Sequence, residues 1–461
     1  MSLLIRGGTV VNADTAFDAD ILCEDGVITQ LAPEIDERSV RVDRVVNAEG
    51  KFVFPGFIDP HVHIYLPFMG AYAKDTYATA SKAAVVGGTT TLIEMVCPAK
   101  EDDPAEAFAL WSGKAEGQSA CDYSFHMGVS RFDDQTEAQL RQIVQDGVTS
   151  FKVFLAYKGA FGVSDDELYR VLKLAKELRV VVTAHCENAE LVASLQAKLI
   201  AEGKTGPEWH EPSRPVRVEA EGVHHFCTFL EMTGASGYVV HTSCRDAVEA
   251  ALPFRARGVD VDLETVIPYL TLDDTWAQRP DFEGAKYVMS PPIRSKDHQA
   301  YLWNALRAGH VSTVATDHAP FDFVGQKDMG KPPAGNFTTI PNGIPSVEHR
   351  VTLLYTHGVK TGRLGLQRFV DVASTHAAKR FGLFPRKGVV QLGADADLVV
   401  WDDGYRGKIS AETHHMNTDY DGFEGFDIQG RPSLVTVRGE VAAENGAFTG
   451  ALGHGRAIRR R

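Results

Sequence analysis

The chain has 461 residues and a formal net charge of −14, with 44% hydrophobic and 23% charged residues. This composition is ordinary for a globular protein, and the acidic balance argues against nucleic acid or an anionic membrane as a partner. No apolar run reaches the ~18 residues of a membrane span, and the start, MSLLIRGGTVVNAD, lacks the apolar core and cleavage segment of a signal peptide.

Short strands joined by tight turns are predicted over residues 1–55. The stretches LLIRGGTVVN, DADILCEDGVITQLAP and RVVNAEGKFVF alternate apolar and polar residues around Gly and Asp-Gly turns. The same pattern returns near the C-terminus in GADADLVVWDDGYRGKIS and SLVTVRGEVAAENGAFTG. We therefore expect a small β domain built from residues 1–55 and 381–461, the latter including a short basic tail.

Residues 56–380 have a different pattern, in which short apolar runs are each followed by a helical segment. Between two of the runs, Ser164 and Glu167 form a capping box ahead of an apolar stripe at helical spacing. Eight strands alternating with helices predict a (β/α)8 barrel. An open doubly wound sheet is the alternative, but no GxGxxG turn follows the first strand. The predicted strands are 56–63, 89–95, 123–129, 149–155, 180–185, 237–243, 261–266 and 312–318.

Metal-ligating residue types lie at the ends of several predicted strands. Strand ends meet at the C-terminal face of a parallel barrel, where active sites are found. His61 and His63 are two residues apart and so point to the same side of their strand. Imidazole and carboxylate together suit Zn²⁺ or a similar divalent metal. The candidate ligands are His61, His63, His185, His241 and Asp317.

Lys152 lies inside an apolar strand, TSFKVFL, where an unpaired ammonium would be costly. It could face water, pair with a carboxylate, or be chemically changed. Two metal ions in the same pocket would disfavour an ammonium still further. A neutral lysine amine reacts with carbon dioxide to give a carbamate, an anion with two oxygens that can bridge two metals. We therefore predict that Lys152 is carboxylated and bridges two divalent ions.

Several motifs together resemble the cyclic amidohydrolases, nearest to the dihydropyrimidinases and D-hydantoinases. They are GFIDPHVHIYLPF, SFKVFLAYK, VTAHCENAEL, GYVVHTSC, MSPPIR, ATDHAPF, IPNGIPSVEHR and DYDGFEGFDIQGRP. The resemblance covers nearly the whole chain. It implies a TIM-like (β/α)8 barrel with a smaller β-sandwich domain from both termini, a binuclear zinc centre bridged by carboxylated Lys152, and a homotetramer or dimer.

The resemblance also implies residue roles and a reaction. His61 and His63 would hold one metal with Asp317, and His185 and His241 the other. A metal-bridging hydroxide would open the ring of a dihydropyrimidine or 5-substituted hydantoin to an N-carbamoyl amino acid, with Asp317 as general acid and base. Tyr157 would stabilise the oxyanion, and Ser290 and Asn342 would hold the ring amide. Leu66, Phe154 and Phe161 would face the exocyclic group, although packing roles are as natural for Phe154.

Other activities remain as alternatives. Dihydroorotase is disfavoured because no cation follows the HxH pair in HVHIYL. Allantoinase is a closer rival than dihydroorotase. A catalytically inactive oligomeric scaffold of the same fold is disfavoured because all the candidate metal ligands are present.

Six cysteines without a CxxC pair indicate reduced thiols in a cytoplasmic enzyme with no disulfide framework.

Overall fold

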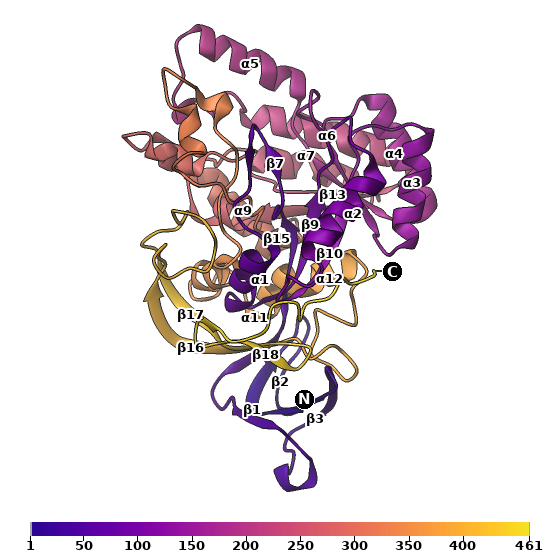
Figure 1. The fold of residues 1–461 in the computed structure, drawn as a ribbon, viewed down its shortest axis with the longest axis vertical. Helices are drawn as coiled ribbons and strands as arrows, with labels where there is room; N and C mark the ends of the chain where they lie inside the picture. Colours follow the sequence, from indigo (N-terminus) through magenta and orange to yellow (C-terminus); the bar gives the residue numbers. More distant parts are fainter. Residues whose placement is uncertain (1, 461) are drawn as a thin grey trace.

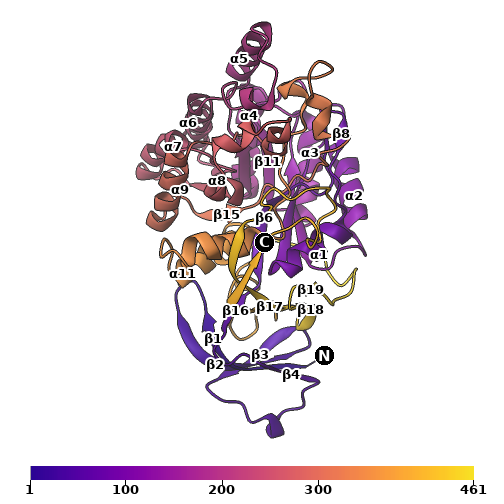
Figure 2. The same ribbon diagram turned by 90° about the vertical axis from the view of Figure 1, so that its left-hand side faces the viewer.

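A computed structural model describes residues 2–460. Eight parallel strands form one sheet whose neighbours follow chain order. Helices cover its outer side (Figures 1 and 2), which confirms the predicted barrel. The strands are β6 Phe57–Val62, β9 Thr89–Val96, β10 Asp122–Gly128, β11 Ser150–Phe154, β12 Val181–His185, β13 Ser236–Val239, β14 Val261–Val266 and β15 Thr313–Ala315.

The barrel closes where its first and last strands meet. The backbone N–H of Asp317 donates to the His61 carbonyl at 3.0 Å, and the N–H of His63 donates to the His318 carbonyl at 2.7 Å. Val62 and His318 form a parallel bridge between these two bonds. The closing seam therefore carries three of the predicted metal ligands.

The helices are held by local signals that the sequence shows in part. Ser164 and Glu167 form the predicted capping box of α4, and the apolar stripe of that helix faces the barrel. Among residues 2–460, no helix has the length and apolarity needed to cross a bilayer. The helices are α1 Tyr77–Val86, α2 Pro104–Ala115, α3 Asp134–Gln145, α4 Asp165–Leu178, α5 Ala189–Ala201, α6 Val216–Thr233, α7 Arg245–Ala256, α8 Ile267–Thr271, α9 Lys296–Ala308, α10 Arg350–Leu354, α11 Leu366–Val370 and α12 His376–Arg380.

Shorter turns complete the helical segments. Two π-helical turns, Tyr355–Val359 and Asp371–Thr375, follow α10 and α11. The short 3₁₀ turns are Glu37–Ser39, Pro207–Trp209, Asp274–Gln278, Glu283–Tyr287, Lys327–Gly330 and Phe337–Thr339.

The two β-rich ends of the chain form one smaller domain, as predicted. Its strands share a single hydrogen-bonded path, in which β16 pairs antiparallel with β5 and so joins the C-terminal part to the N-terminal part. Side chains from both parts pack into one apolar cluster. The strands are β1 Leu3–Val11, β2 Ala16–Glu24, β3 Val27–Ala32, β4 Arg44–Asn47, β5 Phe52–Pro55, β16 Leu398–Lys408, β17 Asp427–Val437, β18 Glu440–Glu444 and β19 Ala447–Phe448.

Two further segments matter for the site. A small hairpin, β7 Pro67–Phe68 with β8 Ala71–Tyr72, follows the first barrel strand. The last residues run under the opposite end of the barrel, where Ile458 N–H donates to Tyr123 O and the buried Arg460 guanidinium donates to Ser150 Oγ. Helix α5 and the β domain lie at opposite ends of the molecule in both views (Figures 1 and 2).

Candidate active site

Three of the predicted ligands converge at the closing seam of the barrel. His61 Nε2 lies 3.3 Å from His63 Nε2. Asp317 Oδ1 lies 3.1 Å from His61 Nε2 and 3.3 Å from His63 Nε2. All three side chains are buried or nearly so. Two imidazoles and a carboxylate pointing at one spot form a donor set suited to a divalent cation.

A second pair of imidazoles faces the first group from the neighbouring side of the barrel. His185 ends β12 and His241 follows β13, and His185 Nδ1 lies 2.9 Å from His241 Nε2. The ring centroids of His61 and His241 are 5.4 Å apart. The two groups are therefore close enough to share a ligand between two ions.

Lys152 lies on β11 and is completely buried. Among residues 2–460, its Nζ has no hydrogen-bond partner, and burial lowers its pKa. Its amine lies 4.8 Å from the Phe154 ring centroid. A buried amine without an acceptor is the unsatisfied group that carboxylation and metal binding would relieve. The residues present therefore fit a binuclear centre.

Two buried glutamates fix the orientation of the imidazoles. Glu264 on β14 accepts a hydrogen bond at 2.7 Å from His61 Nδ1, so the Nε2 of that ring is left for a ligand. Glu187 lies 2.8 Å from His185 Nε2, which leaves Nδ1 of that ring free to point at His241. Carboxylates that hold the second ring nitrogen are typical of histidine metal ligands.

Charge and burial act differently on the imidazoles. Burial lowers the pKa of His63 to about 4, which keeps that ring neutral and able to ligate. Burial alone would also lower the pKa of His61, but Glu264 and Asp317 outweigh it and raise the pKa to about 9. An ion at this site must therefore displace a proton from His61 at neutral pH.

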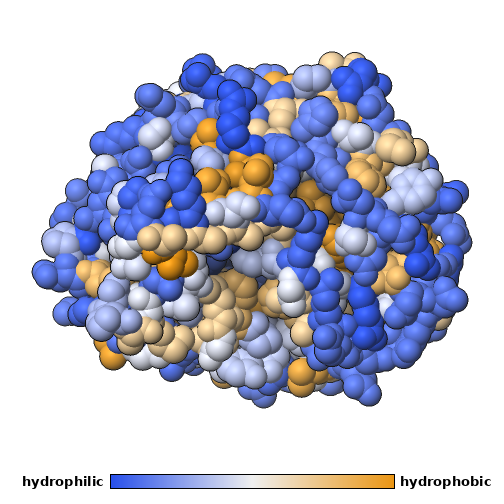
Figure 3. Space-filling view, turned by 90° about the horizontal axis from the view of Figure 1, so that it is seen from above, coloured by the Kyte–Doolittle hydropathy of each residue, from blue (hydrophilic) through white to orange (hydrophobic). Residues whose placement is uncertain are grey.

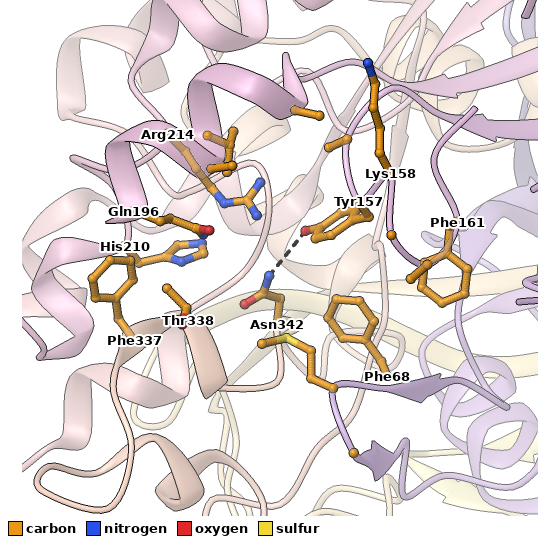
Figure 4. A pocket seen from close by; sticks show the side chains of 18 of the residues that line it. Phe68, Tyr157, Lys158, Phe161, Gln196, His210, Arg214, Phe337, Thr338 and Asn342 are labelled. Carbon is orange, nitrogen blue, oxygen red and sulfur yellow. Dashed lines mark hydrogen bonds between the residues drawn. The ribbon is translucent and has the colours of Figure 1, made fainter. Parts of the chain in front are cut away.

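The predicted substrate residues line a small inner cavity of about 60 Å³ above these ligands. Asn342 Nδ2 donates to Ser290 Oγ at 2.9 Å and to the Tyr157 hydroxyl at 3.3 Å. Figure 4 shows Tyr157 and Asn342 directed toward one another. The lining also includes Leu66, Phe154 and Phe161, together with His63, Lys152, His185, His241 and Asp317.

A wider cavity of about 800 Å³ leads inward from the surface. The hairpin β7–β8 and helix α5 form parts of its wall, and apolar side chains such as Phe68 and Phe337 predominate in it. Figure 3 looks onto this end of the molecule and shows a hollow with apolar residues around it. The inner site is therefore reached through an apolar vestibule.

Three site residues have left-handed backbone conformations, which side chains other than glycine rarely adopt. The φ angles are 57° at Tyr157, 40° at His241 and 52° at Asp317. Such strain persists only where the surrounding structure enforces it, and it gathers at functional sites. Here it turns the three side chains toward the cavity as the chain leaves each strand.

The sequence did not single out several residues that complete the site. Arg214 comes from the 202–215 loop, and its Nη1 donates to Glu187 at 2.5 Å while its guanidinium lies 5.2 Å from the Tyr157 ring centroid. His210, from the same loop, donates from Nε2 to the Met289 carbonyl at 2.9 Å. Cys97 Sγ lies 3.9 Å from His63 Nδ1. Of these residues, Glu187 could have been found from the sequence, because it lies two residues beyond the candidate ligand His185.

Other histidines have partners outside the cluster of candidate ligands. His318 Nε2 lies 2.8 Å from Asp75, and its Nδ1 accepts from the Ser346 N–H. His349 and His414 both contact one oxygen of Asp421, at 2.8 and 3.1 Å, and neither lines the inner cavity or the wider one. This second cluster of potential ligands is an internally paired group that ties the C-terminal region to α10.

Comparisons with known proteins agree with this geometry. The family model described as "Amidohydrolase family" matches residues 52–442. A D-hydantoinase of Geobacillus stearothermophilus is 44% identical over 100% of this chain and 97% of its own. A dihydropyrimidinase of Rattus norvegicus is 38% identical over 99% of this chain and 88% of its own. The solved structure of a D-hydantoinase (dihydropyrimidinase) from Thermus sp. superposes with a TM-score of 0.96 and 59% identity, covering 99% of each chain.

Proposed function

The chain belongs to the amidohydrolase family and is a cyclic amidohydrolase, and from that premise we propose its substrates and mechanism. We propose that it hydrolyses the cyclic amide bond of dihydropyrimidines and 5-substituted hydantoins to N-carbamoyl amino acids. The observation that carries this proposal is the position of the buried Lys152 amine, which has no hydrogen-bond partner in the described part of the chain. It lies among four histidines and Asp317, beneath the Tyr157–Asn342–Ser290 wall.

The family is metal-dependent, and the structure has a candidate His/Asp cluster for an ion. We propose that His61, His63 and Asp317 hold one divalent ion, and His185 and His241 the other. Lys152, carboxylated on Nζ, would bridge the two ions. The donor set suits zinc best. When bound, the ions would lower the pKa of water toward about 7 and so supply the nucleophile at neutral pH.

We propose that Asp317 moves the proton in both halves of the reaction. Its carboxylate lines the inner cavity, and the neighbouring imidazoles hold its pKa well below the usual range despite burial. An ionised carboxylate can accept the proton of the attacking water. Asp317 can then return that proton to the ring nitrogen as the amide bond breaks.

We propose that Tyr157 stabilises the oxyanion that develops on the substrate carbonyl. The Tyr157 hydroxyl lines the inner cavity and accepts a hydrogen bond from Asn342 Nδ2, so its own proton is free to be donated. The Arg214 guanidinium, paired with Glu187, lies beside the Tyr157 ring. A preorganised donor of this kind contributes about 3 kcal/mol to transition-state stabilisation in other enzymes.

The remaining substrate contacts follow from the cavity walls. Ser290 and Asn342 would hold the ring amide, and Leu66, Phe154 and Phe161 would surround the exocyclic group at the entrance to the apolar vestibule. A substituent that continues outward meets Phe68 and Phe337. The lining therefore favours apolar exocyclic groups.

We also propose the domain bounds, the oligomeric state and the compartment of the protein. We place the catalytic barrel at residues 56–380 and the β domain at 1–55 and 381–461. The protein would act as a homotetramer or dimer in the cytoplasm. Support for a reducing compartment comes from the six cysteines, which are all buried and unpaired within residues 2–460.

The test is a ring-opening assay with dihydrouracil and both enantiomers of phenylhydantoin, using metal-replete and chelator-treated protein. Turnover that falls on chelation and returns with added Zn²⁺ is the expected result. Preference among the compounds then distinguishes a pyrimidine-degrading enzyme from a broader hydantoinase. No turnover of any of them by protein containing two metals would overturn the proposed substrates in favour of allantoin or another cyclic ureide.

A further inference from the structure

One buried lysine outside the metal centre has no anionic partner. Lys327 begins the short turn Lys327–Gly330 and is completely buried. No salt bridge within the described residues involves it; its Nζ instead donates to two backbone carbonyls, Pro341 O at 2.9 Å and Val288 O at 3.1 Å. Burial lowers the pKa of Lys327 to about 7, because the charged ammonium is disfavoured there.

The two carbonyls belong to the two loops that carry the proposed ring contacts. Pro341 directly precedes Asn342, and Val288 lies two residues before Ser290. The Val288 carbonyl also accepts from the Gly343 N–H at 2.9 Å. On the cavity side, Asn342 Nδ2 bonds Ser290 Oγ at 2.9 Å. Lys327 thus ties the loops together from behind, while their side chains meet in front (Figure 4 shows Asn342 from the cavity side).

We propose that Lys327 is a positioning residue that fixes the separation of the Ser290 and Asn342 loops, so that the cyclic ureide ring is held in register with the metal centre. This inference rests on the function proposed above. It assigns Lys327 no contact with substrate.

The peptide geometry gives the amine a second effect on the same site. The Pro341–Asn342 peptide is trans, so its N–H points away from the carbonyl that Lys327 binds. Within residues 2–460 this Asn342 N–H has no acceptor. A donor at the carbonyl end polarises the peptide and strengthens its N–H as a donor. A ring carbonyl in the inner cavity is the acceptor that such an N–H would suit.

If Lys327 only stabilised the fold, its replacement would change the unfolding temperature and not the kinetics. An apolar side chain of similar length would lose the two hydrogen bonds to the carbonyls but would also remove the desolvation penalty of a buried ammonium, which is the larger effect. Lys327→Met is therefore expected to unfold at the same temperature or higher and to keep both metals, since Lys327 contacts no metal ligand. Lys327→Gln is the second variant, because its amide is neutral but can still donate to one carbonyl.

The experiment measures kcat and KM for dihydrouracil and 5-phenylhydantoin in the wild type, Lys327→Met and Lys327→Gln. Lys331→Met, which removes an exposed lysine from the same segment, is the matched control. Metal content and the thermal unfolding midpoint are recorded for each protein. Binding of hydantoin to chelator-treated protein is measured by calorimetry, so that ring binding is observed without turnover.

The expected result is a loss in kcat/KM on the order of 10–100-fold for Lys327→Met, which is the size of effect that a misplacement of about 1 Å produces. The kcat/KM of Lys327→Gln should lie between those of Lys327→Met and the wild type, and KM should rise in both variants. Hydantoin binding to the chelated protein should weaken in the same order. Unchanged kinetics and binding in both Lys327 variants would overturn the positioning role while leaving the proposed function intact. Failure of the wild type itself to open either ring would instead overturn the proposed function and, with it, this role.

Discussion

Replacing Glu264 by glutamine tests whether charge behind His61 tunes the metal centre. Glu264 Oε1 accepts from His61 Nδ1 at 2.7 Å and from the His241 N–H at 3.0 Å, and Oε2 accepts from the Tyr238 hydroxyl at 2.8 Å. In Glu264→Gln the amide oxygen can keep the first two bonds. The Tyr238 hydroxyl can turn to accept from the new amide and donate to Thr313 Oγ1, 2.5 Å away. The substitution therefore removes charge and keeps shape.

The size of the effect follows from the bond that changes. A hydrogen bond to a charged group contributes about 1.5–3 kcal/mol, against about 0.5–1.5 kcal/mol for a neutral one. Loss of such a partner typically weakens metal binding by about 10–100-fold. Part of this loss is offset at neutral pH, because Glu264 also contributes to raising the pKa of His61 to about 9 and so makes a proton compete with the ion. The loss should therefore grow as the pH rises from 7 to 9.

The assay is competition for Zn²⁺ with a chelator of known affinity at pH 7 and at pH 9, followed by kcat at saturating metal. Glu264→Gln is expected to bind metal more weakly, with the larger deficit at pH 9. Tyr238→Phe is the matched control, since it removes one hydrogen bond to the same carboxylate but keeps the carboxylate's charge. Equal metal affinity of Glu264→Gln and the wild type at pH 9 would refute the reasoning.

Other residues of the site give further predictions. Asp317→Asn should keep metal yet lower kcat by about 10²–10⁴-fold, the range for a lost general acid and base; metal analysis beside steady-state kinetics checks this, and near-wild-type kcat contradicts it. Tyr157→Phe should lower kcat by about 10²–10³-fold with a smaller change in KM, measured under saturating metal. Lys152→Met should bind fewer ions per chain by elemental analysis, and the chelated variant should unfold at a higher temperature than the chelated wild type, because an unpaired buried amine is removed. Burial lowers the pKa of Lys327 to about 7, against about 10.4 in an unfolded chain. Between these values the unfolded state binds more protons, so the free energy of unfolding of the wild type should rise relative to Lys327→Met by up to ~1.4 kcal/mol per pH unit from pH 7 to 10, in urea titrations.

The barrel and the metal ligands could be predicted because their signals are local. Each strand is a short apolar run, and the residue types at its end follow directly in the chain, as with His61 and His63. The unusual position of Lys152 inside an apolar strand was visible for the same reason. The contacts of Ser290, Asn342 and Leu66 had no such signal and came only from the family resemblance.

The residues that sequence analysis missed act through partners far away in the chain. Glu264 could be placed on a strand, but its bond to His61 spans 203 residues. Lys327 begins a short 3₁₀ turn and Arg214 lies in a loop, and in neither place does a periodicity show which way a side chain points. Their roles depend on how loops from different βα units meet over the barrel, and no local pattern encodes that meeting.

The seam between β6 and β15 has a consequence for how the chain folds. Its two sides lie more than 250 residues apart in sequence, as in the Thr316 Oγ1 to His61 carbonyl bond. Closing a loop of that length costs about 5 kcal/mol in chain entropy, and β15 contributes only three residues of strand to offset it. A cation held by His61, His63 and Asp317 would join both sides at once. Metal loading would then act as the last step of barrel assembly, and amide hydrogen exchange along β6 and β15 should be the first to accelerate when the ion is withdrawn.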